Sequence, residues 1–294
     1  MPSLKDLKNR IASVKSTQKI TKAMQLVAAA KFKRAQDAAQ ASRPYASRMA
    51  SVLANLSATV GEGSGGPKLL SGSGASDTHL LVVMTAERGL AGGFNAYTVK
   101  LAKQKIGELR AAGKTVKILT VGKKGREQLT REYGDMFVGH VDLSDVKGGD
   151  FTESALALGH DLTNRFDTSE FDVCTLIYSQ FQNVMSQVPT AQQLIPAAAP
   201  DDAETVDLGG AIYQYEPSEE GILETLLPRY INTQILSAIL ESAAGEQASR
   251  MTAMDNATRN AGEMIDSLSL KYNRARQAQI TTELIEIIAG AEAV

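Results

Sequence analysis

The chain has 294 residues, of which 43% are apolar, and its formal net charge is −2. This length allows one large domain or two ordinary domains with a buried core, and the near-neutral balance gives no overall reason to expect nucleic acid binding. No stretch approaches the ~18 consecutive apolar residues of a membrane-spanning helix. The single cysteine, Cys174, cannot form an internal disulfide, which is typical of a reducing compartment, and its apolar surroundings predict a buried bystander.

The first segment, residues 1–57, is predicted to be one long helix, because helix formers dominate it and no glycine occurs before Gly61. Residues 1–34 carry nine basic side chains and one acidic side chain. Such a basic helix could meet nucleic acid phosphates, lie on an anionic membrane, or present the solvated or partner-facing side of a coiled coil. Phe32 is the one aromatic residue before residue 41, which disfavours single-stranded nucleic acid and favours the partner-facing interpretation.

Steps of three and four residues along this segment give a coiled-coil stripe that is apolar at both ends and polar in the middle. Gln18 and Gln25 fall in that polar middle, where they could fix the register of the pairing. Ile20, Met24 and Val27 form a more apolar stripe beside it. We therefore predict a heptad pattern interrupted by a stutter.

The last segment, residues 217–294, is predicted to be a second long helix from near Glu219 to about Ile288, with Pro228 as a candidate kink. Its stripe is regular and consists of Met251, Met254, Thr258, Ala261, Ile265, Leu268, Tyr272 and Ala275. Neither helix can bury its stripe alone, so we expect the two to pair as a long antiparallel coiled coil.

Between them, residues 78–216 alternate predicted strands with predicted helices, which is typical of a mainly parallel sheet covered by helices. The strands are expected at 79–85, 115–121 and 171–178, and the helices near 94–112, 122–133 and 151–166. Residues 58–77 form a Gly/Ser-rich linker before this domain, and residues 196–207 an acidic loop near its end. The predicted fold is therefore mixed: a coiled coil of the terminal helices with an inserted Rossmann-like α/β domain.

The glycine-rich stretch TAERGLAGGFNA, residues 85–96, follows the first predicted strand and raises the question of a nucleotide loop. Its glycines, Gly89, Gly92 and Gly93, do not have the spacing of a dinucleotide fingerprint, and no Lys-Ser or Lys-Thr follows them as in a P-loop. The following helix could still approach an anion with its N-terminus. A tight strand-to-helix connection is the favoured interpretation, and no cofactor is predicted.

Catalytic and metal sites find no support in the residue pattern. His79, His140 and His160 lie far apart and lack a cysteine or carboxylate at ligand spacing. The chain has no G-x-S-x-G turn and no Cys/His pair that would indicate nucleophilic catalysis. We therefore predict neither catalytic residues nor metal ligands.

Two long stretches, residues 10–35 and 250–291, together with ERGLAGGFNA, resemble the gamma-subunit family of the F-type ATP synthase, in its bacterial form. The resemblance covers essentially the whole chain. It implies a non-catalytic rotor whose terminal helices form the central stalk inside a ring of three alpha and three beta subunits. It also implies that the α/β domain lies beside the epsilon subunit and the c-subunit ring, and that the protein transmits torque between proton flow and the beta subunits.

The resemblance further implies which residues meet these partners. The contacts with the beta subunits are expected at Met24, Arg250, Gln277 and Thr281, and the side facing the c ring is expected at Tyr213 and Tyr215. Membrane contact is expected only through partners, at the cytoplasmic face of a bacterial plasma membrane, and the start MPSLKDL favours a bacterial protein over a mitochondrial precursor. A coiled-coil scaffold unrelated to energy conversion is the alternative function.

Overall fold

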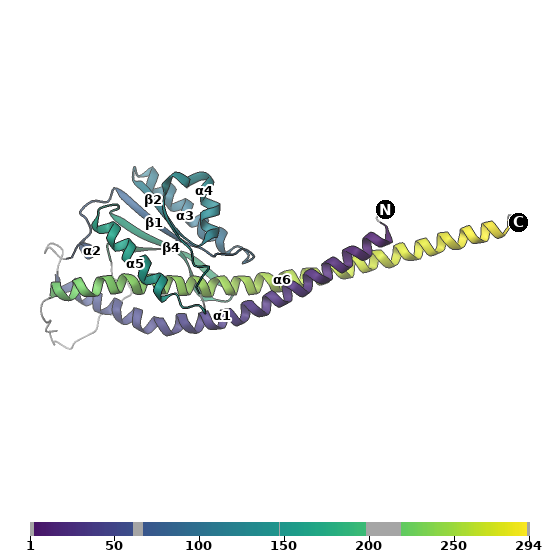
Figure 1. The fold of residues 1–294 in the computed structure, drawn as a ribbon, viewed down its shortest axis with the longest axis horizontal. Coiled ribbons are helices and arrows are strands. Elements are labelled where there is room, and N and C mark those ends of the chain that lie inside the picture. The colour runs from purple at the N-terminus through teal and green to yellow at the C-terminus, as the bar shows by residue number, and fades with distance from the viewer. Residues whose placement is uncertain (1–2, 61–66, 147, 198–218, 293–294) are drawn as a thin grey trace. The chain divides into compact units, whose positions relative to one another are not determined.

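The computed structural model describes residues 3–60, 67–146, 148–197 and 219–292 (Figure 1). Two long helices, α1 (Leu4–Val60) and α6 (Glu219–Glu292), lie at the two ends of the chain. Ser3 and Asp6 cap the start of α1 reciprocally, because each backbone N–H donates to the other residue's side chain, at 3.2 and 3.1 Å. This pattern is the capping box, which satisfies two N–H groups that have no partner within the helix.

Both long helices continue through their prolines. α1 contains Pro44 and α6 contains Pro228, and neither helix ends at its proline. A proline removes one helical hydrogen bond. Next to these sites, buried side chains of α1 pack in one cluster with buried side chains of α6; they include Met49, Leu53, Leu223, Leu227 and Tyr230. This packing offsets the lost hydrogen bonds, and α1 runs to Val60, three residues past the predicted end.

The predicted linker contains a short helix, α2 (Lys68–Ser71), that composition alone did not indicate. Leu69 and Leu70 pack against the cluster between α1 and α6, and the N–H of Ala197 donates to the Leu69 carbonyl at 2.7 Å. Gly72 follows with a φ of 82°, a conformation that glycine adopts without strain. Residues 67–71 are therefore part of the packed domain and not a flexible linker.

The central sheet has the strand order β3-β2-β1-β4-β5. Its strands are β1 (Thr78–Met84), β2 (Thr115–Val121), β3 (Phe137–Val141), β4 (Val173–Asn183) and β5 (Ser186–Ile195). The first four strands run parallel, and β5 pairs antiparallel with β4. The connecting helices are α3 (Phe94–Ala111), α4 (Lys123–Tyr133) and α5 (Thr152–Asp167), and a 3-10 turn, η1 (Gly134–Met136), leads into β3. This is the predicted Rossmann-like arrangement.

Helices cover both faces of the sheet and give it two cores (Figure 1). On one face, Leu162 of α5, Leu176 of β4 and Ile235 of α6 are fully buried in one cluster. On the other face, Ile106 of α3 and Leu129 of α4 are fully buried against the sheet. The predicted strands and helices are all present, and α6 is an integral part of the α/β core.

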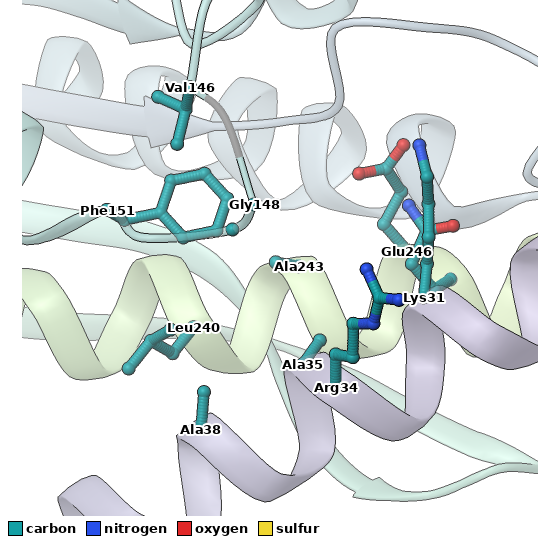
Figure 2. A pocket seen from close by; sticks show the side chains of 12 residues that line it. Lys31, Arg34, Ala35, Ala38, Val146, Gly148, Phe151, Leu240, Ala243 and Glu246 are labelled. Atoms are coloured by element: carbon teal, nitrogen blue, oxygen red, sulfur yellow. The ribbon is translucent and has the colours of Figure 1, made fainter.

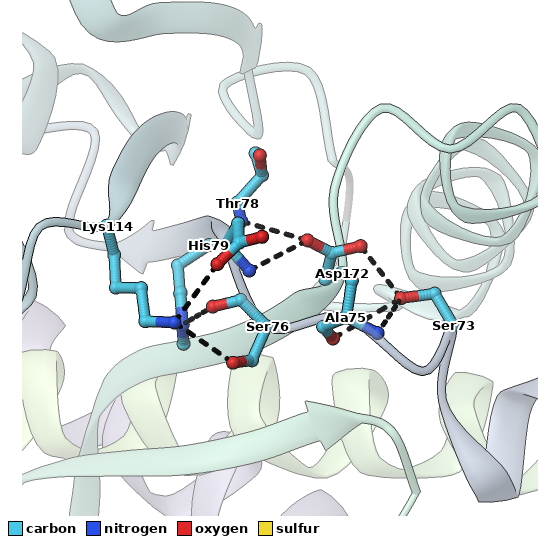
Figure 3. Close-up of polar contacts among 8 residues, drawn as sticks. Ser73, Ala75, Ser76, Thr78, His79, Lys114 and Asp172 are labelled. Carbon is cyan, nitrogen blue, oxygen red and sulfur yellow. Dashed lines mark hydrogen bonds and ion pairs between the residues drawn. The ribbon is translucent and has the colours of Figure 1, made fainter.

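At the amino end of the sheet, Asp172, the residue before β4, is bonded to residues at the start of β1 and just before it. Its carboxylate accepts hydrogen bonds from the backbone N–H groups of Asp77 and Thr78, at 3.0 and 2.9 Å, and from the Ser73 hydroxyl at 2.7 Å (Figure 3). These bonds, that from Thr78 first, hold the pKa of Asp172 below its ordinary value. The chain that enters β1 is therefore fixed to the sheet.

The hairpin of β4 and β5 is anchored on both long helices. The rings of Phe32 on α1 and Phe181 on β4 lie 5.5 Å apart, and the Arg43 guanidinium donates to the Phe181 carbonyl at 3.4 Å. Arg43 also lies 3.6 Å from the Glu241 carboxylate of α6, which joins the two helices beside the hairpin. Further along α6, the Ser249 hydroxyl donates to the Gln187 side chain at 2.7 Å. These contacts make the inner parts of both helices inseparable from the α/β domain.

The contacts between residues form two compact units, which we call the terminal unit (Met1–Ala29 with Arg250–Val294) and the central unit (Ala30–Ser249). The predicted segments 1–57, 58–77, 78–216 and 217–294 follow changes in sequence character, so their boundaries differ from those of the units. The difference arises because residues on the inner parts of α1 and α6 join the cores of the central unit.

Candidate partner interface

The terminal unit is an antiparallel pair formed by the start of α1 and the last part of α6. Along α1 the inward positions follow alternating steps of three and four residues, and each is buried or half-buried: Leu4, Leu7, Ile11, Val14, Gln18, Thr21, Gln25 and Ala28. On α6 the predicted stripe from Met251 to Ala275 is likewise buried or half-buried throughout. We call these two rows together the seam.

The predicted stutter is wrong, because the seam runs without interruption through its polar middle. Ile20 and Val27 are 57% and 56% exposed and lie outside the seam. In their place Thr21 lies 2.7 Å from Thr258, hydroxyl to hydroxyl, and the Gln25 amide donates to Asp255 at 2.8 Å. Gln18 also donates to the Thr258 carbonyl, at 3.5 Å. Because these polar side chains satisfy one another across the seam, an apolar detour is unnecessary.

The structure does not bring the predicted interface residues into one cluster. Met24 and Arg250 are half-buried, Met24 next to the polar middle of the seam. Gln277 and Thr281 are exposed one turn apart, and the Thr281 hydroxyl donates to the Gln277 carbonyl at 2.9 Å. Tyr213 and Tyr215 lie outside the described residues.

The end of α6 lies beyond the seam, whose last residue on α6 is Ala275. From Arg276 to Ala291 every residue is exposed. The exposed apolar side chains there include Ile280, Leu284, Ile285, Ile287 and Ile288. Large apolar side chains that are exposed together at one end of a helix are typical of an interaction site.

A second exposed apolar surface lies on α1, and the sequence pattern did not predict that its residues would be exposed. Ile20, Leu26 and Val27 are each more than half exposed, around Met24. The signal was present: these residues fall outside the regular steps of three and four. We interpreted them as the seam because they are more apolar than the residues that form it.

The glycine-rich stretch is a strand-to-helix connection, as favoured from its spacing: β1 ends at Met84 and α3 begins at Phe94. Leu90 and Gly92 adopt positive φ values of 63° and 56°. At Gly93 an added Cβ would approach the ring of Tyr97 to 2.5 Å, so a larger residue there would have to displace this exposed side chain.

Residues of this stretch accept hydrogen bonds from the backbone N–H groups at the start of α4. The first three N–H groups of α4 donate to three consecutive residues: Lys123 to the Glu87 carboxylate at 3.3 Å, Lys124 to the Ala86 carbonyl at 3.1 Å, and Gly125 to the Thr85 hydroxyl at 2.7 Å. In nucleotide-binding folds such N–H groups receive phosphate. Here the chain's own acceptors fill them.

Glu87 also reaches the exit of β3, where its other oxygen accepts from the Leu143 N–H at 2.7 Å. Beside it, Lys123 forms an ion pair with Asp142 at 2.9 Å, which raises the pKa of Lys123. Hydrogen bonds from Ser144 first, and then from Lys123, hold the pKa of Asp142 well below its usual range. The carboxyl ends of β1, β2 and β3 are thus joined by internal polar contacts.

The histidines are used singly, and each contacts a different neighbour. His79 contacts the Ser76 carbonyl, His140 the Thr120 hydroxyl and His160 the Asn164 amide. Among the described residues, no three His, Cys, Asp or Glu side chains gather as a metal site would need.

Cys174 is fully buried, and burial raises the pKa of its thiol. No helix in the described part of the chain is both long enough and apolar enough to span a membrane.

Comparison with known proteins decides the family. A family model described as ATP synthase matches residues 3–294. The ATP synthase gamma chain of Hyphomonas neptunium is 74% identical to the chain, and that of Ruegeria sp. (strain TM1040) is 63% identical, in both cases over the full length of both proteins. The chain belongs to the ATP synthase gamma-chain family.

Solved structures agree with this membership. A chain from the central stalk and c ring of the Tetrahymena thermophila mitochondrial ATP synthase is 27% identical, with a TM-score of 0.60 over 81% of this chain and 99% of that one. A chain of the Euglena gracilis mitochondrial ATP synthase, 17% identical, shares the fold with a TM-score of 0.68 over 99% of this chain and 94% of that one. The fold of this chain is therefore shared with chains of known ATP synthases.

Proposed function

We propose that the chain is the rotor of an ATP synthase central stalk, which carries torque between a c-subunit ring and catalytic beta subunits without catalysing a reaction itself. The observation that carries this proposal is the terminal unit: a paired shaft with a polar seam, exposed apolar surfaces on α1 and an unpaired apolar end of α6. Such a shaft offers exposed apolar side chains to partners on α1 and at the end of α6. Membership of the gamma-chain family supplies the context.

The physical task of such a rotor is to present a different surface to each surrounding subunit. Differential contacts shift each subunit toward a different conformation, as any ligand does that binds two states unequally. The energy comes from charge movement, worth about 2.3 kcal/mol per elementary charge at 100 mV. Met24, Arg250, Gln277 and Thr281 are the proposed contacts with beta subunits, and Tyr213 and Tyr215 the proposed contacts on the c-ring side.

The proposed partners are alpha, beta and epsilon subunits and the c ring, and no nucleic acid. Membrane contact is proposed only through these partners, at the cytoplasmic face of a bacterial plasma membrane. At the start of α4, Thr85 and Glu87 accept hydrogen bonds from N–H groups that could otherwise bind a phosphate, which supports a role without nucleotide bound at that helix.

Reconstitution tests the proposal. The chain, mixed with alpha and beta subunits of a close relative, is expected to form a complex that hydrolyses ATP, and failure to associate would exclude the rotor role.

Removing the last ~20 residues separates a rotor from a scaffold. A rotor should lose coupling of ATP hydrolysis to proton pumping while its thermal stability is kept, because residues 276–291 are all exposed. A scaffold would not couple hydrolysis to pumping in the first place.

A further inference from the structure

A cleft in the central unit lies among α1, α6 and the residues just before α5, and neither the rotor role nor the family assigns it a ligand. Its volume is about 310 Å³, at the lower end of the range for small-molecule sites. Its floor is apolar because small side chains of the two helices leave the space open, namely Ala35 and Ala38 of α1 and Ala243 of α6. Phe151 forms one wall (Figure 2).

One end of the cleft is basic. Lys31 and Arg34 line it, one turn apart on α1, and both side chains are exposed (Figure 2). Neither has an ion pair or side-chain hydrogen bond within the described part of the chain. By contrast, Lys33 between them is paired with Asp37 at 2.8 Å. Glu246 is the one carboxylate among the lining residues, so the lining carries two cations against one anion.

We propose that this cleft binds a small amphipathic organic monoanion, with its acidic group between Lys31 and Arg34 and its apolar body on the alanine floor. The charge of the rim selects an anion, and Glu246 disfavours a higher negative charge at the same place. The apolar floor and the Phe151 ring select a hydrocarbon or aromatic body over a bare inorganic anion, because burying that body removes apolar surface from water. A ligand there would contact α1, α6 and Phe151 together.

Alanine-methyl NMR of the full chain tests this with octanoate as the probe. Octanoate is expected to shift the methyl signals of Ala35, Ala38 and Ala243 in a saturable way. Acetate, which lacks the apolar body, and octylammonium, which has the opposite charge, are expected to bind at least about tenfold more weakly. Equal binding of octanoate and octylammonium would overturn the proposal, and so would the absence of saturable shifts at these three methyl groups.

Matched variants locate the site. Ala243→Leu fills the floor and should abolish binding, whereas Ala41→Leu, at an exposed position of α1, should leave it intact. Lys31→Gln with Arg34→Gln should weaken octanoate binding about tenfold, the loss expected for one charge-assisted contact, and Lys33→Gln should not. Unchanged octanoate affinity in the Lys31/Arg34 variant would contradict the proposal even if Ala243→Leu failed to fold. These outcomes do not depend on assembly with other subunits, so they are distinct from the test of the rotor role.

Discussion

The terminal and central units are built on opposite principles. In the central unit, two cores of large apolar side chains enclose the sheet, and many of these side chains are fully buried. In the described part of the terminal unit, four apolar side chains are buried, namely Leu7, Ala28, Met254 and Ala261. The middle of the seam is instead polar, with one threonine–threonine contact and one glutamine–aspartate hydrogen bond. A protein that needed the helix pair only for stability would gain more from an apolar seam and covered faces. The contrast indicates that the central unit supplies stability and the terminal unit supplies surface.

The largest expected effect lies in the central unit. Leu162→Ala removes a fully buried side chain from the core between α5, β4 and α6. It should lower the free energy of unfolding by about 2–5 kcal/mol, the range for cavities left by such truncations. Urea unfolding measures it. Leu156→Ala, on the same helix but 50% exposed, is the matched control and should cost less than about 1 kcal/mol. Equal losses would remove the basis for the contrast between the units.

A smaller effect is expected at the edge of the central sheet. Glu87→Ala leaves the N–H groups of Lys123 and Leu143 without their carboxylate acceptor. Because Glu87 is half-buried and water can replace it in part, the expected loss of stability is about 1–2 kcal/mol. Glu127→Ala, which removes a more exposed carboxylate paired with Lys124, is the control and should change stability by less than about 0.5 kcal/mol.

In the terminal unit, the effect on stability should appear as an interaction energy between Thr21 and Thr258. A double-mutant cycle of Thr21→Val and Thr258→Val should give an interaction energy of about 0.5–1.5 kcal/mol, because their hydroxyls share a hydrogen bond across the seam. Replacing Thr17 in the same cycle should give none, since its hydroxyl bonds to the Ser13 carbonyl on its own helix. A zero coupling energy for the first pair would show that the polar middle of the seam does not hold the helices together.

The smallest effect concerns pH and the attachment of the hairpin to α6. Burial raises the pKa of Glu241 above its ordinary value of 4.5, and Arg43 and the Phe181 N–H offset this in part. A folded-state pKa above the unfolded one means that the group's contribution to stability is full below pH 4.5 and is lost as the pH rises through the folded-state value. Glu241→Gln should therefore stabilise the chain slightly at pH 7 and flatten this dependence.

The pKa of Asp172 is shifted in the opposite direction, so this residue serves as the comparison for Glu241. Its pKa is held below 3.8, so its contribution is present above pH 3.8 and is lost as the pH falls through the lowered value. Asp172→Asn should therefore reduce stability at pH 7 and weaken the acid-induced loss. Thermal unfolding from pH 3 to 8 measures both variants, and parallel pH profiles for the two would contradict these assignments.

The sequence predicts the architecture well where its patterns are strong. Long helix-forming segments and apolar runs bounded by turn residues identified α1, α6, β1, β2 and β4. It missed β3 and β5, which are edge strands. β3 has five residues with a central Gly139, and β5 is polar and contains Pro189, so neither shows the apolar run of a buried strand.

The seam shows what the periodicity of apolar residues cannot predict, namely which stripe of a helix is buried. The regular steps of three and four were visible at Gln18, Thr21 and Gln25, yet hydrophobicity favoured Ile20 and Val27. Which stripe of α1 faces α6 depends on hydrogen bonds between the two helices, to Thr258 and Asp255, and these are not visible in the spacing of one helix. The resemblance proposes interface residues by their positions in the chain, but their exposure required the fold.

The most direct measurement of the rotor proposal is rotation itself. Cys174 is the single cysteine and is fully buried, so a cysteine at Met185, which is 83% exposed at the tip of the β4–β5 hairpin, provides a unique reactive thiol. With a bead attached there and the complex fixed through its beta subunits, the bead should rotate in one direction when ATP is added. A complex that contains the Met185→Cys chain and hydrolyses ATP while the bead stays still would contradict the rotor role.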